Sequence, residues 1–371
     1  MIDFRGSDQR VSEQLSRASS VIQGFLDQGE FDGAGLAVWL RGEPVADLYF
    51  GMAAADMPAG PGTLWPLASI SKLYTVSAIM ALVEEGRLTL SMRLADLIPE
   101  FGTDQRSYTR LWHLLTHTSG LIYESPDMER LLARETPLVD MLREAFSYSL
   151  MAPPGTRFEY SDYGIALAGR VAEVVSGQSL SQLVQERVIE PAGLRATYFP
   201  PPRDVYDRLA HIRDAPAAGS PGEMYNSDYS RQLAHPSFGV VASLRDLLRF
   251  GMLFHPEASH RILSSATVRA MTRDQLDGGL TGGLVGVDLH RPQPWGLGFM
   301  VRGQSMQLGF GELASDSAFG HPGATGCVLL IDPEHDIALA FVSNRHAAAG
   351  FERFLFREAA ITNSVVSALS S

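Results

Sequence analysis

The stretch Pro66-Leu67-Ala68-Ser69-Ile70-Ser71-Lys72 contains the only lysine of this 371-residue chain. All the other basic residues, 29 of the 30, are arginines. Arginine and lysine both serve as solvated positive charges, but only a desolvated amine can lose its proton near neutral pH. We therefore interpret Lys72 as a deprotonable amine. Its expected partner is the hydroxyl of Ser69, three residues earlier and one helical turn away.

The sequence after Ser69 predicts a helix. Apolar residues recur at helical spacing as far as Glu85, and Gly86 follows as a favoured C-terminal cap residue. Backbone N–H groups at the start of a helix lack intrahelical partners and can face a developing negative charge. The Ser-x-x-Lys spacing alone is also typical of a polar first turn on an ordinary surface helix, so it does not establish a catalytic site.

Strand patterns lie near both ends of the chain, and the middle is mostly helical or loop-like. The expected strands span residues 35–40, 45–50, 295–301, 327–331 and 337–343, and the expected terminal helices span 11–28 and 350–369. This order predicts an α/β domain formed by residues 1–75 and 236–371. A mainly helical domain, residues 76–235, is inserted between its two parts, with the active site at the interface.

Two segments have the composition of loops. Residues 200–236 are rich in Pro, Gly, Ser and Asp, and predict a long surface loop. Residues 278–286 are rich in glycine but lack the lysine and the strand-then-helix setting of a phosphate-binding loop, which favours a flexible loop. We expect the loops at 200–236 and 278–292 to shape the pocket.

Composition limits the function classes. The net charge of −12 argues against a nucleic-acid partner. The chain has no apolar stretch of membrane-spanning length, and its start is charged where a secretory signal would be apolar. Its single cysteine, Cys327, excludes an intrachain disulfide and is expected in the core of an apolar strand. These features predict a cytoplasmic protein that acts on a small molecule, with oligomeric state left open.

Two further motifs follow Ser69-x-x-Lys72 along the chain: Tyr160-Ser161-Asp162, and His321-Pro322-Gly323-Ala324-Thr325-Gly326 before a strand. In this order the three segments resemble the serine hydrolases of the penicillin-binding protein and class C β-lactamase superfamily. That superfamily includes family VIII carboxylesterases, D-stereospecific aminopeptidases and amidases, and some acyltransferases. The resemblance covers roughly residues 10 to 365. It implies a β-lactamase-like α/β fold, an antiparallel sheet flanked by helices from both termini.

The resemblance assigns catalytic roles. Ser69 is the expected nucleophile, and the backbone N–H groups of Ser69 and Ala324 are the expected oxyanion hole. Lys72 and Tyr160 are expected to carry the proton between nucleophile and leaving group, and which is the primary base stays open. For Lys72 to act as a base near pH 7, its pKa would have to fall from about 10.4 by roughly 3 units, through burial and a neighbouring cation.

The expected substrate-binding residues are Asp162, His321 and Gly323. Relatives commonly have asparagine at the position of Asp162, whose amide donates to the acyl-side carbonyl of the substrate. An ionised aspartate only accepts hydrogen bonds, which fits either a substrate amine or a supporting role. His321 occupies the position of a lysine in class C β-lactamases, where it would tune Tyr160 or meet a substrate carboxylate.

No metal or cofactor is predicted. His113 and His117 have the i, i+4 spacing of a zinc-binding pair on a probable helix. The glutamate that follows the first histidine in metalloprotease helices is missing, and the segment resembles a structural stretch of this superfamily.

These features together predict a serine hydrolase that forms a covalent acyl-enzyme, with a carboxylesterase acting on small esters as the leading interpretation. A D-stereospecific amidase or aminopeptidase, or an acyltransferase, is the alternative. A β-lactamase or DD-peptidase, and a catalytically silent scaffold, are weaker alternatives.

Overall fold

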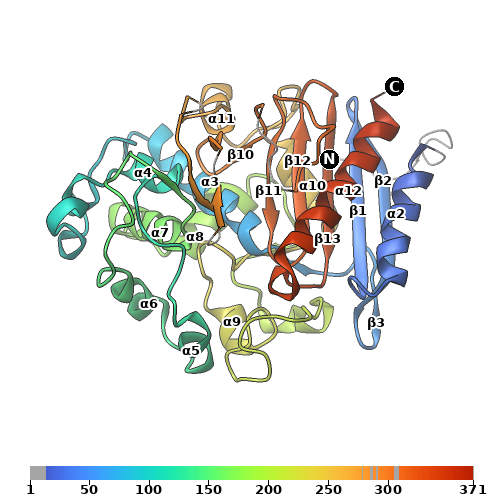
Figure 1. The fold of residues 1–371 in the computed structure, drawn as a ribbon, viewed down its shortest axis with the longest axis horizontal. Helices are drawn as coiled ribbons and strands as arrows, with labels where there is room; N and C mark the ends of the chain where they lie inside the picture. The colour runs from blue at the N-terminus through green and yellow to red at the C-terminus, as the bar shows by residue number, and fades with distance from the viewer. Residues whose placement is uncertain (1–13, 278, 285–286, 290, 305–308, 371) are drawn as a thin grey trace.

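An antiparallel sheet organises the fold (Figure 1). The computed structural model describes residues 14–277, 279–284, 287–289, 291–304 and 309–370. In this part of the chain the sheet has seven strands, in the order β10-β11-β12-β13-β1-β2-β3. Their bounds are β1 Gly33–Leu40, β2 Glu43–Ala54, β3 Met57–Pro58, β10 Met300–Val301, β11 Phe319–Gly323, β12 Cys327–Asp332 and β13 Ile337–Ser343.

Strands from the two ends of the sequence are neighbours in this sheet. β1 pairs with β13 in antiparallel register, with Ala34 opposite Ser343. β1 continues into β2 through the two-residue turn Arg41-Gly42, whose φ angles of 48° and 92° are both positive. Such turns match the right-handed twist of the two strands they join. The predicted antiparallel sheet, built from both ends of the sequence, is confirmed.

Helices cover both faces of the sheet. α2 (Ser16–Asp27) and α12 (Phe351–Leu369) pack against each other on one face, and α10 (Leu244–Met252) lies on the other (Figure 1). Successive side chains of a strand point to opposite faces, so Leu36 and Ala37 of β1 enter different hydrophobic cores. Because both faces are covered, the central strands β1 and β13 are apolar almost throughout.

A mainly helical part of the chain lies beside the sheet and surrounds α3 (Ser71–Glu84) (Figure 1). Every side chain from Ser71 to Leu82 is buried, which is the pattern of a helix enclosed on all sides. α7 and α8 pack against it. The helices of this part and its surroundings are α4 Leu111–Leu115, α5 Met128–Ala133, α6 Leu138–Ala145, α7 Asp162–Ser176, α8 Leu180–Val184, α9 Asp228–Gln232 and α11 Ser265–Thr272.

Six short strands of the described residues form two further sheets of three strands each. Their bounds are β4 Trp65–Pro66, β5 Phe158–Glu159, β6 Thr197–Tyr198, β7 Val241–Ala242, β8 Gly282–Leu284 and β9 Val287–Leu289. β8 runs parallel to β5, so the prediction of a flexible loop at 278–286 is wrong for Gly282–Leu284, the residues of β8. The predicted boundary between the helical and α/β domains stays a prediction.

Two other sequence predictions need correction. Only Met300–Val301 of the predicted strand 295–301 pairs in the sheet, because Gly298 adopts a φ of 79° and Gly296 N–H donates to the Phe299 carbonyl, closing a turn. The segment 200–236 is not only a surface loop. It contains α9 and buries apolar side chains, which pack in a hydrophobic cluster of their own: Ile212, Ala215, Met224 and Tyr225.

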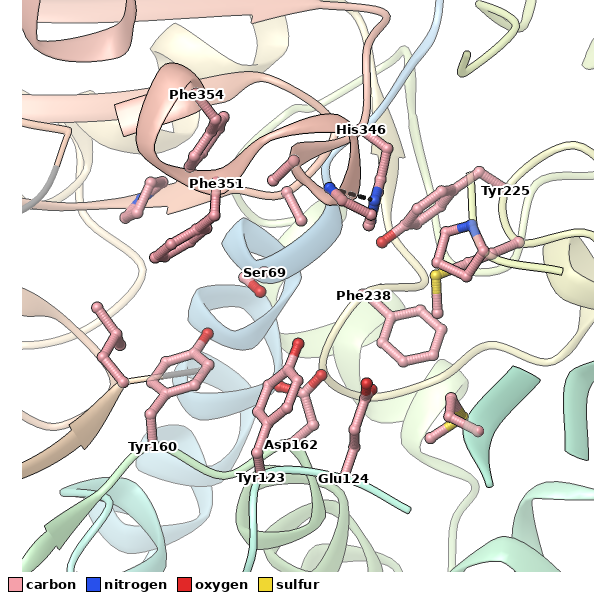
Figure 2. A pocket seen from close by; sticks show the side chains of 18 of the residues that line it. Ser69, Tyr123, Glu124, Tyr160, Asp162, Tyr225, Phe238, His346, Phe351 and Phe354 are labelled. Carbon is pink, nitrogen blue, oxygen red and sulfur yellow. Dashed lines mark hydrogen bonds between the residues drawn. The ribbon is translucent and has the colours of Figure 1, made fainter. Parts of the chain in front are cut away.

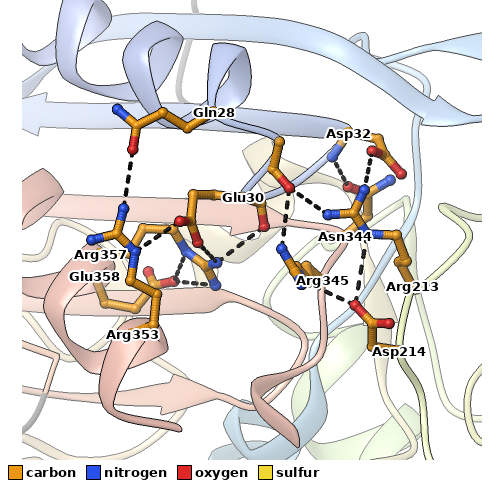
Figure 3. Close-up of polar contacts among 11 residues, drawn as sticks. Gln28, Glu30, Asp32, Arg213, Asp214, Asn344, Arg345, Arg353, Arg357 and Glu358 are labelled. Atoms are coloured by element: carbon orange, nitrogen blue, oxygen red, sulfur yellow. Dashed lines mark hydrogen bonds and ion pairs between the residues drawn. The ribbon is translucent and has the colours of Figure 1, made fainter. Parts of the chain in front are cut away.

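A network of polar contacts fastens the loop before β1 to the segment after β13 (Figure 3). Asn344 Oδ1 accepts hydrogen bonds from the N–H groups of Asp32 and Gly33, at 3.0 and 2.9 Å. Glu30 forms an ion pair of 2.7 Å with Arg353 on α12. The loop before β1 is therefore held by residues on both sides of the short 3₁₀ turn η7 (Ala347–Ala349).

Glu358 on α12 is buried beside Arg357, whose Nε donates to its Oε1 at 3.4 Å, while Oε2 has no partner in the described residues. Burial raises the pKa of Glu358 to about 7, and the charge of Arg357 opposes this only in part. A carboxyl whose pKa is raised on folding contributes stability below its unfolded pKa. That stability is lost as the pH rises through the folded pKa.

We therefore expect Glu358→Gln to change the pH dependence of stability. Between about pH 5.5 and pH 8 the wild type should lose roughly 2 kcal/mol of unfolding free energy relative to the variant. Urea unfolding of both proteins at the two pH values measures this difference, and any pH-independent effect of the substitution cancels. Glu352→Gln, an exposed position on the same helix, is the control. Equal differences at both pH values for Glu358→Gln would contradict the expectation.

Candidate active site

Ser69 lies in a single 3₁₀ turn, η1 (Ala68–Ile70), that leads directly into α3. Ala68, immediately before it, has a φ of 45°, in the left-handed region that residues other than glycine seldom adopt. Such positions persist only where the surroundings hold them, and they cluster at functional sites. Here the Leu67 N–H donates to the Val240 carbonyl at 3.0 Å, and this bond holds the chain on the N-terminal side of the turn.

Lys72 lies one turn further along, with its side chain fully buried. Its Nζ donates to Ser69 Oγ at 2.8 Å and to the Ser237 carbonyl at 3.3 Å. The same Nζ is 2.7 Å from Asp162 Oδ1. The structure thus brings the predicted pair together and adds a carboxylate, which gives a buried series of hydroxyl, amine and carboxylate.

The charge neighbouring Lys72 differs from the prediction. Burial alone would lower the pKa of the amine, but the carboxylate of Asp162 and the phenol of Tyr160 outweigh it, so the pKa of Lys72 is raised. The expected fall by roughly 3 units is therefore wrong for the free protein, because the close partner is an anion instead of a cation. Lys72 rests as an ammonium group, paired with Asp162.

Asp162 owes its position to the start of α7. Ser161 caps this helix by accepting a hydrogen bond from the Gly164 N–H at 3.0 Å, and Asp162 follows in the first turn, where the helix dipole favours a carboxylate. The Asp162 N–H donates to the Tyr123 carbonyl. Since its carboxylate is paired with Lys72, the structure favours a role for Asp162 in positioning Lys72 over direct contact with a substrate amine.

Tyr160 lies between β5 and α7, with its ring over Lys72: the Nζ is 4.9 Å from the ring centroid. Its N–H donates to the Gly283 carbonyl, which positions the residue from β8. Burial raises the pKa of Tyr160, although the charge of Lys72 opposes the rise. The phenol is therefore neutral and able to donate a proton.

His117 supports Tyr160, a role that the sequence did not reveal. α4 ends at Leu115, and His117 follows it with a φ of 55°, so the expectation that His113 and His117 share one helix is wrong. Its ring lies 4.4 Å from that of Tyr160, and its Nδ1 accepts from the Ser161 N–H at 3.1 Å. Burial, then the charge of Lys72, holds the pKa of His117 well below its usual value.

The end of β11 lies beside the Ser69 turn. A Cβ at Gly323 would lie 2.4 Å from the Leu67 carbonyl oxygen, so only glycine allows the strand to come this close. The Ala324 carbonyl accepts from the Ala347 N–H at 2.7 Å. Among the backbone hydrogen bonds that the described residues form in turns, loops and caps, none is donated by the N–H of Ser69 or of Ala324. Both N–H groups are therefore candidates to bind an oxyanion.

His321 is on the same strand, and its ring centroid is 6.0 Å from that of Tyr160. Its Nδ1 lies 2.6 Å from the Pro322 carbonyl, an acceptor, which places the proton on Nδ1. The buried Nε2 has no partner in the part of the chain that the structure describes. Burial, then the charge of Lys72, lowers the pKa of His321 to about 3, so a neutral ring does not favour a substrate carboxylate.

These residues open onto a cavity of about 420 Å³ (Figure 2). The loops at 200–236 and 278–292 contribute Pro216, Met224, Tyr225 and Leu284, which confirms that they shape the pocket. Lining residues that the sequence did not single out include Tyr123, Glu124, Phe238, His346, Phe351 and Phe354. They come from loops and helix ends far apart in the sequence, where no motif identifies them.

The described residues contain no group of three or more His, Cys, Asp or Glu side chains placed to hold a metal ion. No helix in the same ranges is both long and apolar enough to cross a membrane.

An antiparallel sheet with helices on both faces, beside a buried helix that begins Ser-x-x-Lys, is the β-lactamase-like α/β fold. A family model described as Beta-lactamase matches residues 18–363, and the chain belongs to this family, within the superfamily of β-lactamase-like and penicillin-binding protein-like serine hydrolases. The resemblance stated from the motifs is thereby confirmed.

Individual relatives are distant. The chain is 27% identical to penicillin-binding protein 4 of Amycolatopsis lactamdurans over 348 residues, which cover 88% of this chain and 84% of that protein. Two solved structures share the fold. EstCE1, described as a hydrolase with promiscuous acyltransferase activity, has a TM-score of 0.75 at 22% identity, covering 96% of this chain and all of that one. A family VIII carboxylesterase has a TM-score of 0.71 at 22% identity, covering 93% and 97%.

We expect Gly323→Ala to lower kcat/KM by about 100-fold, because the added Cβ forces the strand that carries the Ala324 N–H away from the Ser69 turn. Steady-state ester hydrolysis measures the loss. The matched control is Gly62→Ala, where a Cβ meets nothing within 4 Å. Near-wild-type turnover of Gly323→Ala, with an unchanged melting temperature, would show that this close approach does not matter for catalysis.

Proposed function

We propose that this protein is a serine esterase that hydrolyses small carboxylic esters through a covalent acyl-enzyme on Ser69. The observation that carries the proposal is the buried series Ser69 Oγ, Lys72 Nζ and Asp162 Oδ1, with successive separations of 2.8 and 2.7 Å, at the base of a cavity. A serine becomes a strong nucleophile when a neighbouring group removes its proton. A buried amine in contact with the hydroxyl supplies such a group.

Proton transfer begins at the ion pair. An ammonium group cannot accept the Ser69 proton, so Lys72 first passes a proton to Asp162 Oδ1. Burial supports this step, because a low-dielectric site disfavours both charges, and burial indeed raises the pKa of the Asp162 carboxyl despite the opposing charge of Lys72. The resulting neutral amine takes the proton of Ser69 Oγ as the oxygen forms its bond to the substrate carbonyl carbon.

The negative charge then moves to the former carbonyl oxygen, facing the backbone N–H groups of Ser69 and Ala324. As the C–O bond to the alcohol breaks, the neutral Tyr160 gives its proton to the departing oxygen, and Lys72 returns a proton to Tyr160. Water then attacks the acyl carbonyl carbon: Tyr160 passes its proton to the neutral Lys72 and takes one from the water. Lys72 protonates Ser69 Oγ as the bond between this oxygen and the acyl carbon breaks, which releases the acid. Asp162 finally returns its proton to Lys72 and so restores the ion pair. His321 stays neutral beside Tyr160, with 6.0 Å between the two ring centroids, and adds no positive charge next to the phenol.

Esters are favoured over amides for a chemical reason. An amide nitrogen must be protonated as it leaves, and a phenol with a raised pKa is a weak acid. An alkoxide or phenoxide leaving group needs less proton transfer to depart. Asp162 also lacks the side-chain N–H that would donate to the carbonyl of an acyl amide, which disfavours β-lactam and peptide substrates. The carboxylesterase among the structures with this fold supports the same choice.

An amidase or aminopeptidase remains the second candidate, because Glu124 places a carboxylate in the cavity where a substrate amine could bind. The cytoplasm as location and a small molecule as the sole required partner remain parts of the proposal.

We expect short-chain nitrophenyl esters to be hydrolysed faster than the anilides of the same acids or of D-amino acids. Absorbance assays on both series measure the preference. Ser69→Ala should abolish turnover, and Lys72→Arg, which keeps the charge without a deprotonable amine, should lower it by about 100- to 10,000-fold.

Faster turnover of D-amino acid anilides would instead establish the amidase. A fluorophosphonate probe distinguishes the remaining case, since it should label the folded wild type at Ser69 and not the Ser69→Ala variant. Absence of both labelling and turnover would favour a catalytically silent scaffold.

A further inference from the structure

Glu124 lines the cavity and has no hydrogen-bond or ion-pair partner in the part of the chain that the structure describes. Figure 2 shows its side chain directed into the cavity from the same side as Asp162. A partly buried carboxylate without a partner is unfavourable unless a ligand compensates it. The proposed reaction does not use Glu124, so its presence in the cavity calls for another role.

The charges that line the cavity have one sign. Glu124, Asp162 and, at the exposed rim, Glu129 are acidic, and no arginine or lysine is among the described lining residues. The two lining histidines, His321 and His346, are neutral, because burial lowers their pKa values to about 3 and about 4. Lys72 is buried beneath the cavity and is already paired with Asp162. Once Glu124 is ionised, the unpaired charge that faces a ligand is therefore negative.

Aromatic side chains line the same cavity as Glu124. Tyr123 precedes it in the chain, and Tyr225 and Phe238 line the cavity across from it (Figure 2). The rings of Tyr225 and Phe238 lie 6.2 Å apart, almost at right angles. The faces of aromatic rings attract cations, and walls of this kind bind quaternary ammonium groups. A carboxylate among such rings suits a positively charged nitrogen better than a neutral alkyl group.

The position of Tyr160 determines whether the acyl part or the alcohol part of an ester lies beside Glu124. The leaving oxygen takes its proton from Tyr160, so the alcohol must lie on the side of Tyr160. Figure 2 shows Tyr160 and Phe351 on one side of Ser69, and Glu124, Phe238 and Tyr225 on the other. The acyl group points away from the leaving group and hence toward Glu124.

We propose that Glu124, Tyr123, Tyr225 and Phe238 form an acyl-binding subsite for a positively charged nitrogen, so that the preferred substrates are esters of amino- or ammonio-substituted acids. This inference rests on the proposed acyl-enzyme at Ser69 and adds the substrate class. Asp162 does not provide the contact, because Lys72 holds its carboxylate.

The electrostatics of Glu124 are consistent with this assignment. Burial, and then the negative charge of Asp162, raise its pKa to about 8, while Lys72 opposes the rise. Three tyrosines also interact with its charge, namely Tyr123, Tyr163 and Tyr225, and burial raises the pKa of each, so they stay neutral. Glu124 is thus protonated below about pH 8, and a bound cation favours its ionised form.

Two isosteric esters test the subsite: the nitrophenyl esters of 4-(trimethylammonio)butanoic acid and of 5,5-dimethylhexanoic acid. They differ only in a quaternary nitrogen in place of a carbon, and neither acyl group titrates. At about pH 8.5 we expect kcat/KM of the wild type to favour the cationic ester by about 10- to 100-fold. Toward about pH 6.5, as Glu124 becomes protonated, the preference should fall by up to about tenfold.

Glu124→Gln keeps the shape of the side chain and removes the charge. It should abolish both the preference and its pH dependence, and the neutral ester, hydrolysed in parallel, is the reference from which the preference is calculated. The matched control is Glu129→Gln, which removes an exposed carboxylate from the rim of the same cavity and should keep the preference. Melting temperatures check that both variants fold.

Binding separates failure of this inference from failure of the proposed reaction. The corresponding amides, 4-(trimethylammonio)butanamide and 5,5-dimethylhexanamide, are titrated calorimetrically into the wild type and Glu124→Gln. Tighter binding of the cationic amide that depends on Glu124 supports the subsite even if no ester is turned over, in which case only the reaction at Ser69 is wrong. Equal binding of the two amides, or an ester preference unchanged in Glu124→Gln, overturns the inference.

Discussion

The buried ion pair between Lys72 and Asp162 is the contact on which the arrangement of this site depends. Desolvation makes such pairs costly, and well-packed apolar residues in their place are often as stable or more stable. Stability alone therefore does not explain an ammonium group with a fully buried side chain. Its contact with Ser69 Oγ at 2.8 Å gives it a chemical use, because the pair holds a proton that can move in either direction beside the nucleophile.

The fold brings the members of this site together from three directions. The turn η1 carries Ser69 and leads into α3, which carries Lys72. α7 begins with Asp162, and β11 brings the Ala324 N–H to the Ser69 turn. Two backbone features make the last approach possible. Ala68 is held at a positive φ, and Gly323 has no side chain to meet the Leu67 carbonyl. The sheet and its covering helices supply the rigidity that such a strained turn requires.

Local patterns predicted much of this from the sequence. The family resemblance of the motifs at Ser69, Tyr160 and His321 predicted the fold and grouped Ser69, Lys72 and Tyr160 in one site, and the strand patterns near both ends of the chain predicted a sheet built from both ends. Periodicity could not show that Asp162 would reach Lys72, because that contact joins two helices across 90 residues and reverses the expected pKa shift. It also could not place Glu124, since a single acidic residue in a loop has no pattern, and only the folded chain puts aromatic rings around it.

The single lysine makes the central claim directly measurable. Lysine labelled with ¹³C at Cε and ¹⁵N at Nζ gives one signal in this chain, whose shift with pH reports the ionisation of Lys72 in the intact protein. The account predicts that Lys72 stays protonated through neutral pH, with a pKa above its ordinary value of 10.5, and that Asp162→Asn lowers this pKa. A Lys72 that is already neutral near pH 7 in the wild type, or whose titration Asp162→Asn leaves unchanged, would contradict it.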